Sequence, residues 1–233
     1  MKSRRLVPEL MDNPELDACH HRDALRGLER INRCTGNGLV AWRPIRELAR
    51  RLERDRLRLL DVATGAADIP IELSRRARTE GLALEIDACD VSQRALEVAE
   101  QNCARAGTRI NLFTLDVVEQ TIGKQYDLIM CSQFLHHLTV EQTESVLLKM
   151  ASAARHRVVV IDLARTRWNW LQVVIATRVL SRSKVVHFDG PQSVRAAYTF
   201  AEIRAIASRV GFVSFSIESR WPCRFVLIGD VNE

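Results

Sequence analysis

Three aspartates stand at the ends of three successive apolar segments, and they are the residues best placed to bind a ligand. Asp61 lies near the end of LRLLDVA (57–63), Asp90 ends LALEIDACD (82–90), and Asp116 ends INLFTLD (110–116). If these segments are parallel strands, their carboxyl ends meet at one edge of a sheet, which is where open α/β sheets bind ligands. Acids at that edge favour a ligand that offers hydroxyl groups, an amine or a positive charge.

The spacing of these acids suits a nucleoside better than a dinucleotide. Asp90 is placed to accept hydrogen bonds from both hydroxyls of a ribose, and Asp116 to contact the exocyclic amine of an adenine. The turn after Asp61 leads into a helix N-terminus, whose dipole favours a carboxylate or phosphate. A pyrophosphate fits poorly, because the turn has only Gly65 in place of a G-x-G-x-x-G fingerprint and no Walker lysine is present.

The elements that must position these residues alternate between short apolar runs and amphipathic stretches. Further strands are predicted at 126–132 and 157–164, and helices at 69–81, 91–107, 139–154 and 198–211. Two closing strands, 212–219 and 224–230, are joined by a short link and must pair antiparallel. The pattern predicts an α/β fold: a doubly wound three-layer sandwich on a mostly parallel seven-stranded sheet that ends in an antiparallel hairpin.

The charge distribution divides the chain into two parts. The net charge is +5, and residues 1–60 carry 14 Lys/Arg against 9 Asp/Glu, whereas residues 61–233 carry 20 of each. We therefore expect an N-terminal helical cap over 1–56 and a main domain over 57–233. Within the main domain, residues 165–198 exceed a normal crossover connection and are expected to form an insertion.

The motifs at the strand ends resemble those of class I S-adenosylmethionine-dependent methyltransferases, most of all the ubiquinone/menaquinone ring methyltransferases. The resemblance rests on LLDVATGAADIP, IDACDVSQRALEVAEQN, LFTLDVVE and YDLIMCSQFLHHLT, which occur in the family's order. It implies S-adenosylmethionine as the cofactor and S-adenosylhomocysteine as the product. By position, the resemblance assigns these residues to the cofactor: Asp61, Ala63 and Gly65 at the methionine part, Asp90 and Val91 at the ribose and adenine, Asp116 and Val117 at the adenine, and Ser132 near the transferred methyl group.

One departure from the family concerns the first turn. The family usually has glycine where this chain has Ala67, and often also at Ala63. An alanine there costs little if its φ is negative, but it disfavours a left-handed turn. Cofactor binding in slightly altered geometry is expected, and a catalytically silent relative remains an alternative.

The catalytic and substrate residues are expected after the fourth strand and in the insertion 165–198, which the resemblance implies covers the substrate. His136 and His137 follow the fourth strand and are candidate bases, as is His187 with Asp189, in a loop predicted from Asp189-Gly-Pro191. Gln133, Trp168, Arg195 and Tyr198 are expected to contact the substrate, while the tryptophans could equally form core or a homodimer interface. No metal site is expected, because the histidines lack ligand-spaced partners.

These observations predict methyl transfer to an oxygen, or an activated carbon, of a small phenolic, quinone-like or polyketide acceptor. The alternative is an RNA- or protein-directed methyltransferase that uses the basic N-terminus, although no aromatic residues interleave the arginines and nucleic acid is disfavoured. No apolar run reaches the length of a membrane span or a signal core. Six scattered cysteines are typical of a reduced, cytoplasmic protein.

Overall fold

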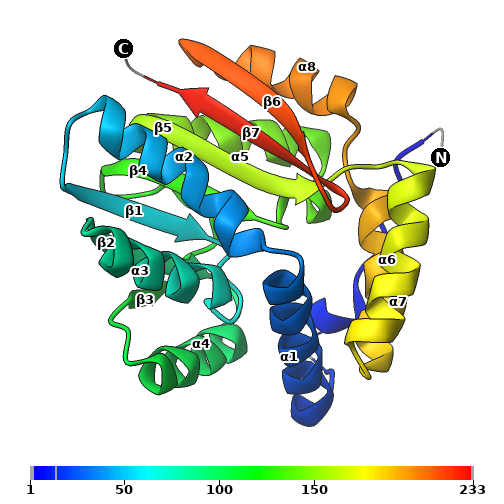
Figure 1. The fold of residues 1–233 in the computed structure, drawn as a ribbon. Coiled ribbons are helices and arrows are strands. Elements are labelled where there is room, and N and C mark those ends of the chain that lie inside the picture. Colours follow the sequence, from blue (N-terminus) through cyan, green and yellow to red (C-terminus); the bar gives the residue numbers. More distant parts are fainter. Residues whose placement is uncertain (1–2, 14, 232–233) are drawn as a thin grey trace.

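The computed structural model describes residues 3–13 and 15–231, so the first two residues and residue 14 of the expected cap lie outside it. A central sheet carries helices on both faces, and α1, α6 and α7 gather beside the carboxyl ends of its strands (Figure 1). In chain order the elements are η1 (Leu10–Asp12), α1 (Ala18–Cys34), α2 (Asn37–Arg51), β1 (Arg56–Val62), α3 (Asp68–Glu80), β2 (Ala83–Asp90), α4 (Gln93–Ala106), β3 (Asn111–Thr114), β4 (Tyr126–Ser132), η2 (Leu135–His137), α5 (Val140–Ala153), β5 (Ala154–Leu163), α6 (Arg167–Leu180), α7 (Lys184–Ala196), α8 (Phe200–Val210), β6 (Ser214–Arg220) and β7 (Arg224–Asp230).

The sheet has seven strands in the order β3-β2-β1-β4-β5-β7-β6, which confirms the predicted fold class. The five strands β1 to β5 pair in parallel, and β7 runs antiparallel between β5 and β6. The order reverses at β1, so the ends of β1 and β4 lie at the switch point where such sheets bind ligands. Asp61 therefore lies beside that switch point.

Successive side chains along a strand point to opposite faces of the sheet, and they form two cores, one on each face. Leu57 and Leu59 of β1 pack with Trp42 and Ile45 of α2, while Leu60 on the same strand faces the cluster of α5 and α8. This is the period of two that a strand buried on both faces requires. Because α2 supplies the core of one face, it belongs to the sandwich, whereas α1 projects past the strand ends.

The turn predicted at Asp189-Gly-Pro191 is wrong, because these residues lie inside α7. Gly190 has a packing role there: a Cβ at this position would lie 2.6 Å from Cγ2 of Thr177. The glycine thus allows α7 to approach α6 closely. Pro191 is eight residues into the helix, so the insertion is a pair of packed helices in place of an exposed loop.

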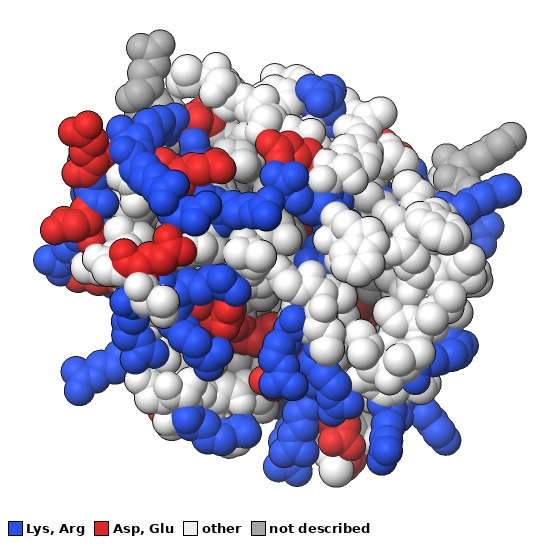
Figure 2. Space-filling view, viewed as in Figure 1, with Lys and Arg blue, Asp and Glu red and all other residues white. Residues whose placement is uncertain are grey.

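The helices α6 and α7 also form part of the outer surface. Figure 2 shows a broad uncharged area over α6 and α7, bordered by basic side chains. Within the described ranges, no helix combines the length and the apolar character that crossing a membrane requires.

Candidate active site

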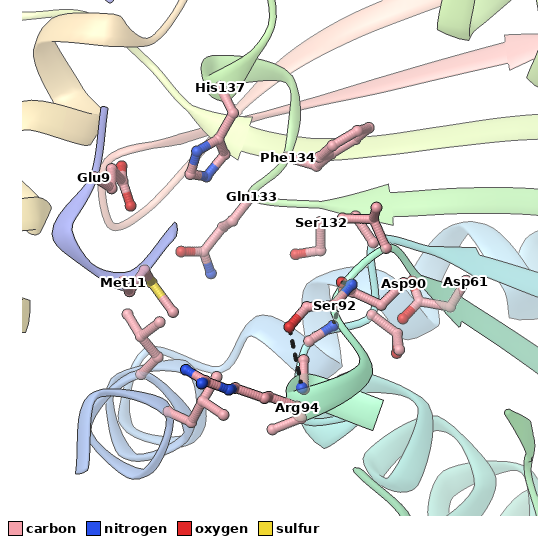
Figure 3. A pocket seen from close by; sticks show the side chains of 18 of the residues that line it. Glu9, Met11, Asp61, Asp90, Ser92, Arg94, Ser132, Gln133, Phe134 and His137 are labelled. Atoms are coloured by element: carbon pink, nitrogen blue, oxygen red, sulfur yellow. Dashed lines mark hydrogen bonds between the residues drawn. The ribbon is translucent and has the colours of Figure 1, made fainter. Parts of the chain in front are cut away.

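A cavity of about 740 Å³ lies at the carboxyl ends of β1, β2, β3 and β4. The structure brings eleven of the predicted site residues together in its wall. They are Asp61, Ala63, Gly65, Asp90, Val91, Asp116, Val117, Ser132, Gln133, His136 and His137. The cap closes the opposite side through α1 and the segment that precedes it. Figure 3 shows Asp61, Asp90 and Ser92 on one side of the space, and Glu9, Met11 and His137 on the other.

The turn after β1 is tied to the end of β2. Asp90 accepts a hydrogen bond from the backbone N–H of Gly65 at 2.8 Å through Oδ2, and one from Ser92 N–H at 2.9 Å through Oδ1. The turn itself uses left-handed backbone at Ala63, Gly65 and Ala67, with φ of 55°, 55° and 58°. The two alanines thus adopt the conformation that glycine would favour, so the turn keeps its left-handed shape despite the extra methyl groups, at a cost of about 1–2 kcal/mol each.

Asp61 is a buried acid of the cavity wall that lacks part of its hydrogen bonding. Its side chain is 2% exposed, and among the described residues its Oδ1 has no hydrogen-bond partner. Burial raises the pKa of Asp61, the nearby Thr64 hydroxyl partly opposes this, and the neighbouring carboxylates of Asp68 and Asp90 add to it, so that the pKa is about 7. A buried carboxyl group held in this way is ready to accept a hydrogen bond from a cationic ligand.

The charge of the wall fits S-adenosylmethionine, which carries an ammonium and a sulfonium. Of the described residues that line it, the acids are Glu9, Glu29, Asp61, Asp68, Asp90 and Asp116, and the one arginine is Arg94. Asp116, two residues past β3, accepts a hydrogen bond from Val118 N–H at 2.9 Å, which fixes its carboxylate at the wall. The residues present would fit S-adenosylmethionine, with Asp61 at its amine end, Asp90 at the ribose and Asp116 at the adenine.

A chain of amide side chains joins the cap to the sheet beside the cavity. Gln133 donates from Nε2 to Oδ1 of Asn32 at 2.6 Å, and Asn32 donates from Nδ2 to Asp68 at 2.9 Å. Gln133 has a φ of 55°, a left-handed conformation that is uncommon outside glycine and marks functional sites. The chain fixes the carboxamide of Gln133 against the end of α1.

A second amide, Asn37, supports the same region from the start of α2. It is fully buried, donates to Oγ of Ser132 at 3.0 Å, and accepts from Nη1 of Arg224 at 3.0 Å. The guanidinium of Arg224 is buried as well. Ser132 and Gln133 are therefore positioned by residues from β7 and from both helices of the N-terminal part.

His136 is held between two carboxylates and cannot easily act as a base. Its Nδ1 lies 2.7 Å from Oδ1 of Asp162, and its Nε2 lies 3.6 Å from Oε1 of Glu9. Burial alone would lower the pKa of His136, but the two carboxylates outweigh it and raise this pKa to about 10. The imidazole is therefore protonated at neutral pH, and this geometry speaks against His136 as the proton acceptor.

Glu9 anchors the N-terminal segment through this cluster. Burial would raise its pKa, but hydrogen bonding to His136 and Ser193 and the nearby His137 lower that pKa to about 2. The ligand atoms of Glu9, His136 and His137 all lie within 4.8 Å of one another, so this is a group that could hold a metal ion. His136 faces a carboxylate on each side, so its protonated ring balances these negative charges without a metal ion.

His137 is the histidine that faces the open space. Its ring lies 4.3 Å from that of His136, centroid to centroid, and it lines the cavity next to Gln133 and Glu9 (Figure 3). Of the three predicted bases, it is the one in the wall that no pair of described carboxylates encloses. The apolar wall beside it includes Met11 and Phe134.

Four predicted residues do not line the cavity. His187 presents Nε2 to the carbonyl oxygen of Ser181 at 2.8 Å, and it does not pair with Asp189, which accepts from Leu10 N–H and Met11 N–H at 2.8 and 3.1 Å. Residues two apart on a helix point to different faces, which explains why the pair expected in a loop does not form in α7.

The other three predicted residues, Tyr198, Arg195 and Trp168, make packing contacts or face solvent outside the cavity. Tyr198 is 1% exposed, and its hydroxyl contacts Thr143 at 2.8 Å while the guanidinium of Arg4 covers its ring. Arg195 lies over the ring of Trp170, and Trp168 points to solvent. Among the described residues, the insertion reaches the cavity wall through Ser193 of α7 alone.

Sequence reasoning missed Glu9, Asn32, Asn37, Asp68 and Asp162. Asp162 had a signal, because it is an acid inside the apolar run 157–164, and such a buried acid needs a partner. The two asparagines and Glu9 have no marker in the sequence. They join the site through tertiary contacts of the N-terminal part alone.

Comparison with known proteins agrees with this geometry. Residues 59–157 match the family model described as "Methyltransferase domain". A search of curated proteins found no match.

Solved methyltransferase structures share the fold at low sequence identity. Magnesium protoporphyrin IX methyltransferase (ChlM) from Synechocystis PCC 6803, with bound SAH, is 18% identical with a TM-score of 0.59, over 95% of this chain and 91% of that one. The S-adenosylmethionine-dependent methyltransferase SibL is 19% identical with a TM-score of 0.66, over 95% and 60%. A SAM-dependent methyltransferase from Aquifex aeolicus is 19% identical with a TM-score of 0.56, over 76% and 82%.

Several of the matched structures are longer, and the chain spans between 50% and 60% of their length. The solved structures share the doubly wound fold, some of them hold SAM or SAH, and the family match covers residues 59–157, which is less than half of the chain. Residues 59–157 are therefore similar to a methyltransferase domain, and the chain as a whole shares the doubly wound fold of solved S-adenosylmethionine-dependent methyltransferases.

Proposed function

We propose that this enzyme transfers a methyl group to an oxygen, or an activated carbon, of a small phenolic, quinone-like or polyketide acceptor. The observation that carries the proposal is the mixed wall of the cavity opposite Asp61, Asp90 and Asp116. Met11, Leu25, Leu28 and Phe134 supply apolar surface there, and His137 with Gln133 supplies polar groups. Apolar walls with a few convergent polar groups are typical of small-molecule sites.

When bound, S-adenosylmethionine supplies an electrophilic methyl group on a positively charged sulfur. The chain's own contribution is alignment: Asp61, Asp90 and Asp116 fix one reactant, and the wall opposite them orients the other. Holding two reactants in line replaces a bimolecular encounter and supplies about 7–11 kcal/mol in well-oriented systems. Alignment is thus the main way in which this cavity can accelerate methyl transfer.

His137 is the proposed general base. In this proposal its ring accepts the proton of the acceptor hydroxyl, while Gln133 donates to the same oxygen. The ring of His136 packs against the His137 ring, with the two centroids 4.3 Å apart. A positioned base contributes typically 10²–10⁴-fold to the rate.

The structure gives reasons to prefer this function to its alternatives. The left-handed turn is kept at both Ala63 and Ala67, which favours a binding-competent site over a silent relative. The cap closes over the cavity with Glu9 and Glu29 in its wall, and carboxylates there would repel the phosphates of RNA. All six cysteines are free, two of them exposed, which is consistent with a reducing, cytoplasmic setting.

The test is S-adenosylhomocysteine release, measured with a panel of phenolic, quinol and polyketide acceptors. We expect turnover with at least one acceptor, and His137→Asn to lower kcat by about 10²–10⁴-fold without changing the affinity for S-adenosylmethionine. His187→Asn is the matched control, because its ring lies outside the cavity, and it should keep wild-type turnover. Turnover that survives in His137→Asn but falls in His187→Asn would reverse the base assignment, and no turnover with any acceptor would overturn the acceptor class.

A further inference from the structure

The outward face of α6 is apolar and lies open to solvent. Trp168, Leu171, Ile175 and Val179 are 67%, 42%, 55% and 75% exposed. Their spacing of three, four and four residues places them on one side of the helix. Phe188 of α7 adds a further exposed ring, at 45%. This set of five residues is called the apolar face below.

The fold does not need the apolar face for its own packing. The opposite side of α6 is the one that contacts the molecule: Thr177 is buried against Gly190 of α7, and the carbonyl of Asn169 faces Sγ of Cys223 at 3.7 Å. A surface helix that is anchored on one side is expected to be polar on the other. Large apolar side chains there indicate a surface used for binding.

The charged residues of the segment that carries the apolar face have one sign. The segment 164–188 contains five Lys/Arg and no Asp or Glu. Arg165 is buried and paired with Glu202. The other four, Arg167, Arg178, Arg182 and Lys184, are exposed, and within the described part of the chain none of them forms an ion pair. Figure 2 shows this arrangement as an uncharged area with basic side chains at its border.

We propose that α6 docks the enzyme onto the surface of an anionic lipid bilayer. An apolar helix face flanked by cations is the pattern of helices that lie in the membrane interface, with tryptophan at the level of the headgroups. The charges also argue against a second copy of this chain, because a twofold interface would place the patch against itself and bring cations together. A bilayer of negative headgroups complements both parts of the patch at once.

Docking through α6 would place the cavity close to the membrane surface. Both α6 and α7 contact α1, and α1 and Ser193 of α7 contribute to the cavity wall. An acceptor with an apolar tail partitions into bilayers, so an enzyme at that surface meets it at high local concentration. This consequence rests on the proposed function, whereas the docking itself does not.

Vesicle co-sedimentation of the full chain tests the proposal. We expect binding to vesicles of phosphatidylglycerol and phosphatidylcholine in equal parts, weak binding to pure phosphatidylcholine, and release as salt is raised. Arg178→Gln with Arg182→Gln should weaken binding about 25-fold, at about fivefold per cation removed. Ile175→Ser with Val179→Ser should weaken it about tenfold or more. All four positions are exposed on α6 or its C-terminal end, so these variants should fold.

Val213→Ser is the matched control, since Val213 is 57% exposed and lies before β6, outside the patch. It should bind as the wild type does. Fluorescence of Trp168 provides a direct probe: quenching by brominated lipids should occur in the wild type and drop in Trp168→Phe. The proposal is overturned if the wild type does not bind anionic vesicles or if the α6 variants bind as well as Val213→Ser. It is also overturned if light scattering shows a dimer that the same variants dissociate, because the face would then join two copies of the chain.

Discussion

Replacing Asp61 with asparagine should make the cofactor-free enzyme more stable and its cofactor binding weaker. Asp61 is buried, its Oδ1 has no partner among the described residues, and burial raises its pKa from 3.8 to about 7. The folded protein therefore keeps a carboxylate at a free-energy cost that the unfolded chain does not have. Asparagine retains the shape and removes the charge, so that cost disappears.

The size and sign of the effect follow from the pKa. A carboxyl group whose folded-state pKa lies above its unfolded value destabilises the fold progressively as pH rises from the lower value to the higher one. One pKa unit corresponds to about 1.4 kcal/mol, so the full effect is about 4 kcal/mol above pH 7. At pH 5 about 2 kcal/mol of it is present. Asp61→Asn should therefore gain more stability at pH 8 than at pH 5.

Urea unfolding of wild type and variant at the two pH values measures this difference. The control is Asp127→Asn, because Asp127 is also buried but accepts from Arg58 N–H at 2.7 Å and from Arg54 at 3.2 Å, so its loss should destabilise. Titration with S-adenosylmethionine should show weaker binding to Asp61→Asn. A variant that is no more stable than wild type at pH 8, or whose gain is the same at both pH values, would refute the reasoning.

Two further predictions concern the turn and the anchor of the cap. Ala63→Gly should raise the free energy of unfolding by about 0.5–1 kcal/mol, because relief of the left-handed strain at Ala63 (φ of 55°) exceeds the added entropy of glycine in the unfolded chain; thermal unfolding checks this, and a loss of stability would show that the turn is not strained. Glu9→Gln should lower the free energy of unfolding by about 3 kcal/mol or more, since it leaves a buried imidazolium with one carboxylate. The contribution of Glu9, whose pKa is lowered to about 2, is complete above pH 4.5 and lost as pH falls through 2. That of His136, whose pKa is raised to about 10, is complete below pH 6.5 and lost as pH rises through 10. The deficit in urea unfolding should thus be largest between pH 4.5 and 6.5, and a deficit that grows toward pH 9 would contradict the ion pair.

The sheet could be predicted because each strand carries its own local signal. Apolar runs such as 57–63 and 126–132 are buried on both faces, and the helices between them have N-caps and glycine stops, such as Ser92 and Gly107 around α4. The acids at the strand ends follow from the same signals, because topology alone brings parallel strand ends together. Asp61, Asp90 and Asp116 could therefore be placed at one edge before any contact was known.

The opposite wall of the cavity could not be predicted in this way. Glu9 reaches His136 across 127 positions of sequence, and Asn32 reaches Gln133 across 101. Such contacts depend on how the N-terminal helices dock, which no local pattern encodes. The turn prediction at Asp189-Gly-Pro191 is wrong for a similar reason. These residue types usually mark a turn, but the close approach of α6 and α7 gives the glycine a packing role inside a helix.

The most direct test of the central claim is calorimetric titration of the wild type and Asp90→Asn with S-adenosylmethionine. Asp90 ends β2 in the cavity wall, and it holds the turn through Gly65 while facing the space expected for the ribose. We predict micromolar-range binding by the wild type, with 1:1 stoichiometry, and a loss of about 10–100-fold in Asp90→Asn, as expected for hydrogen bonds to a charged group. An absence of binding by the wild type, or equal affinity in the variant, would contradict the assignment of this cavity to the cofactor.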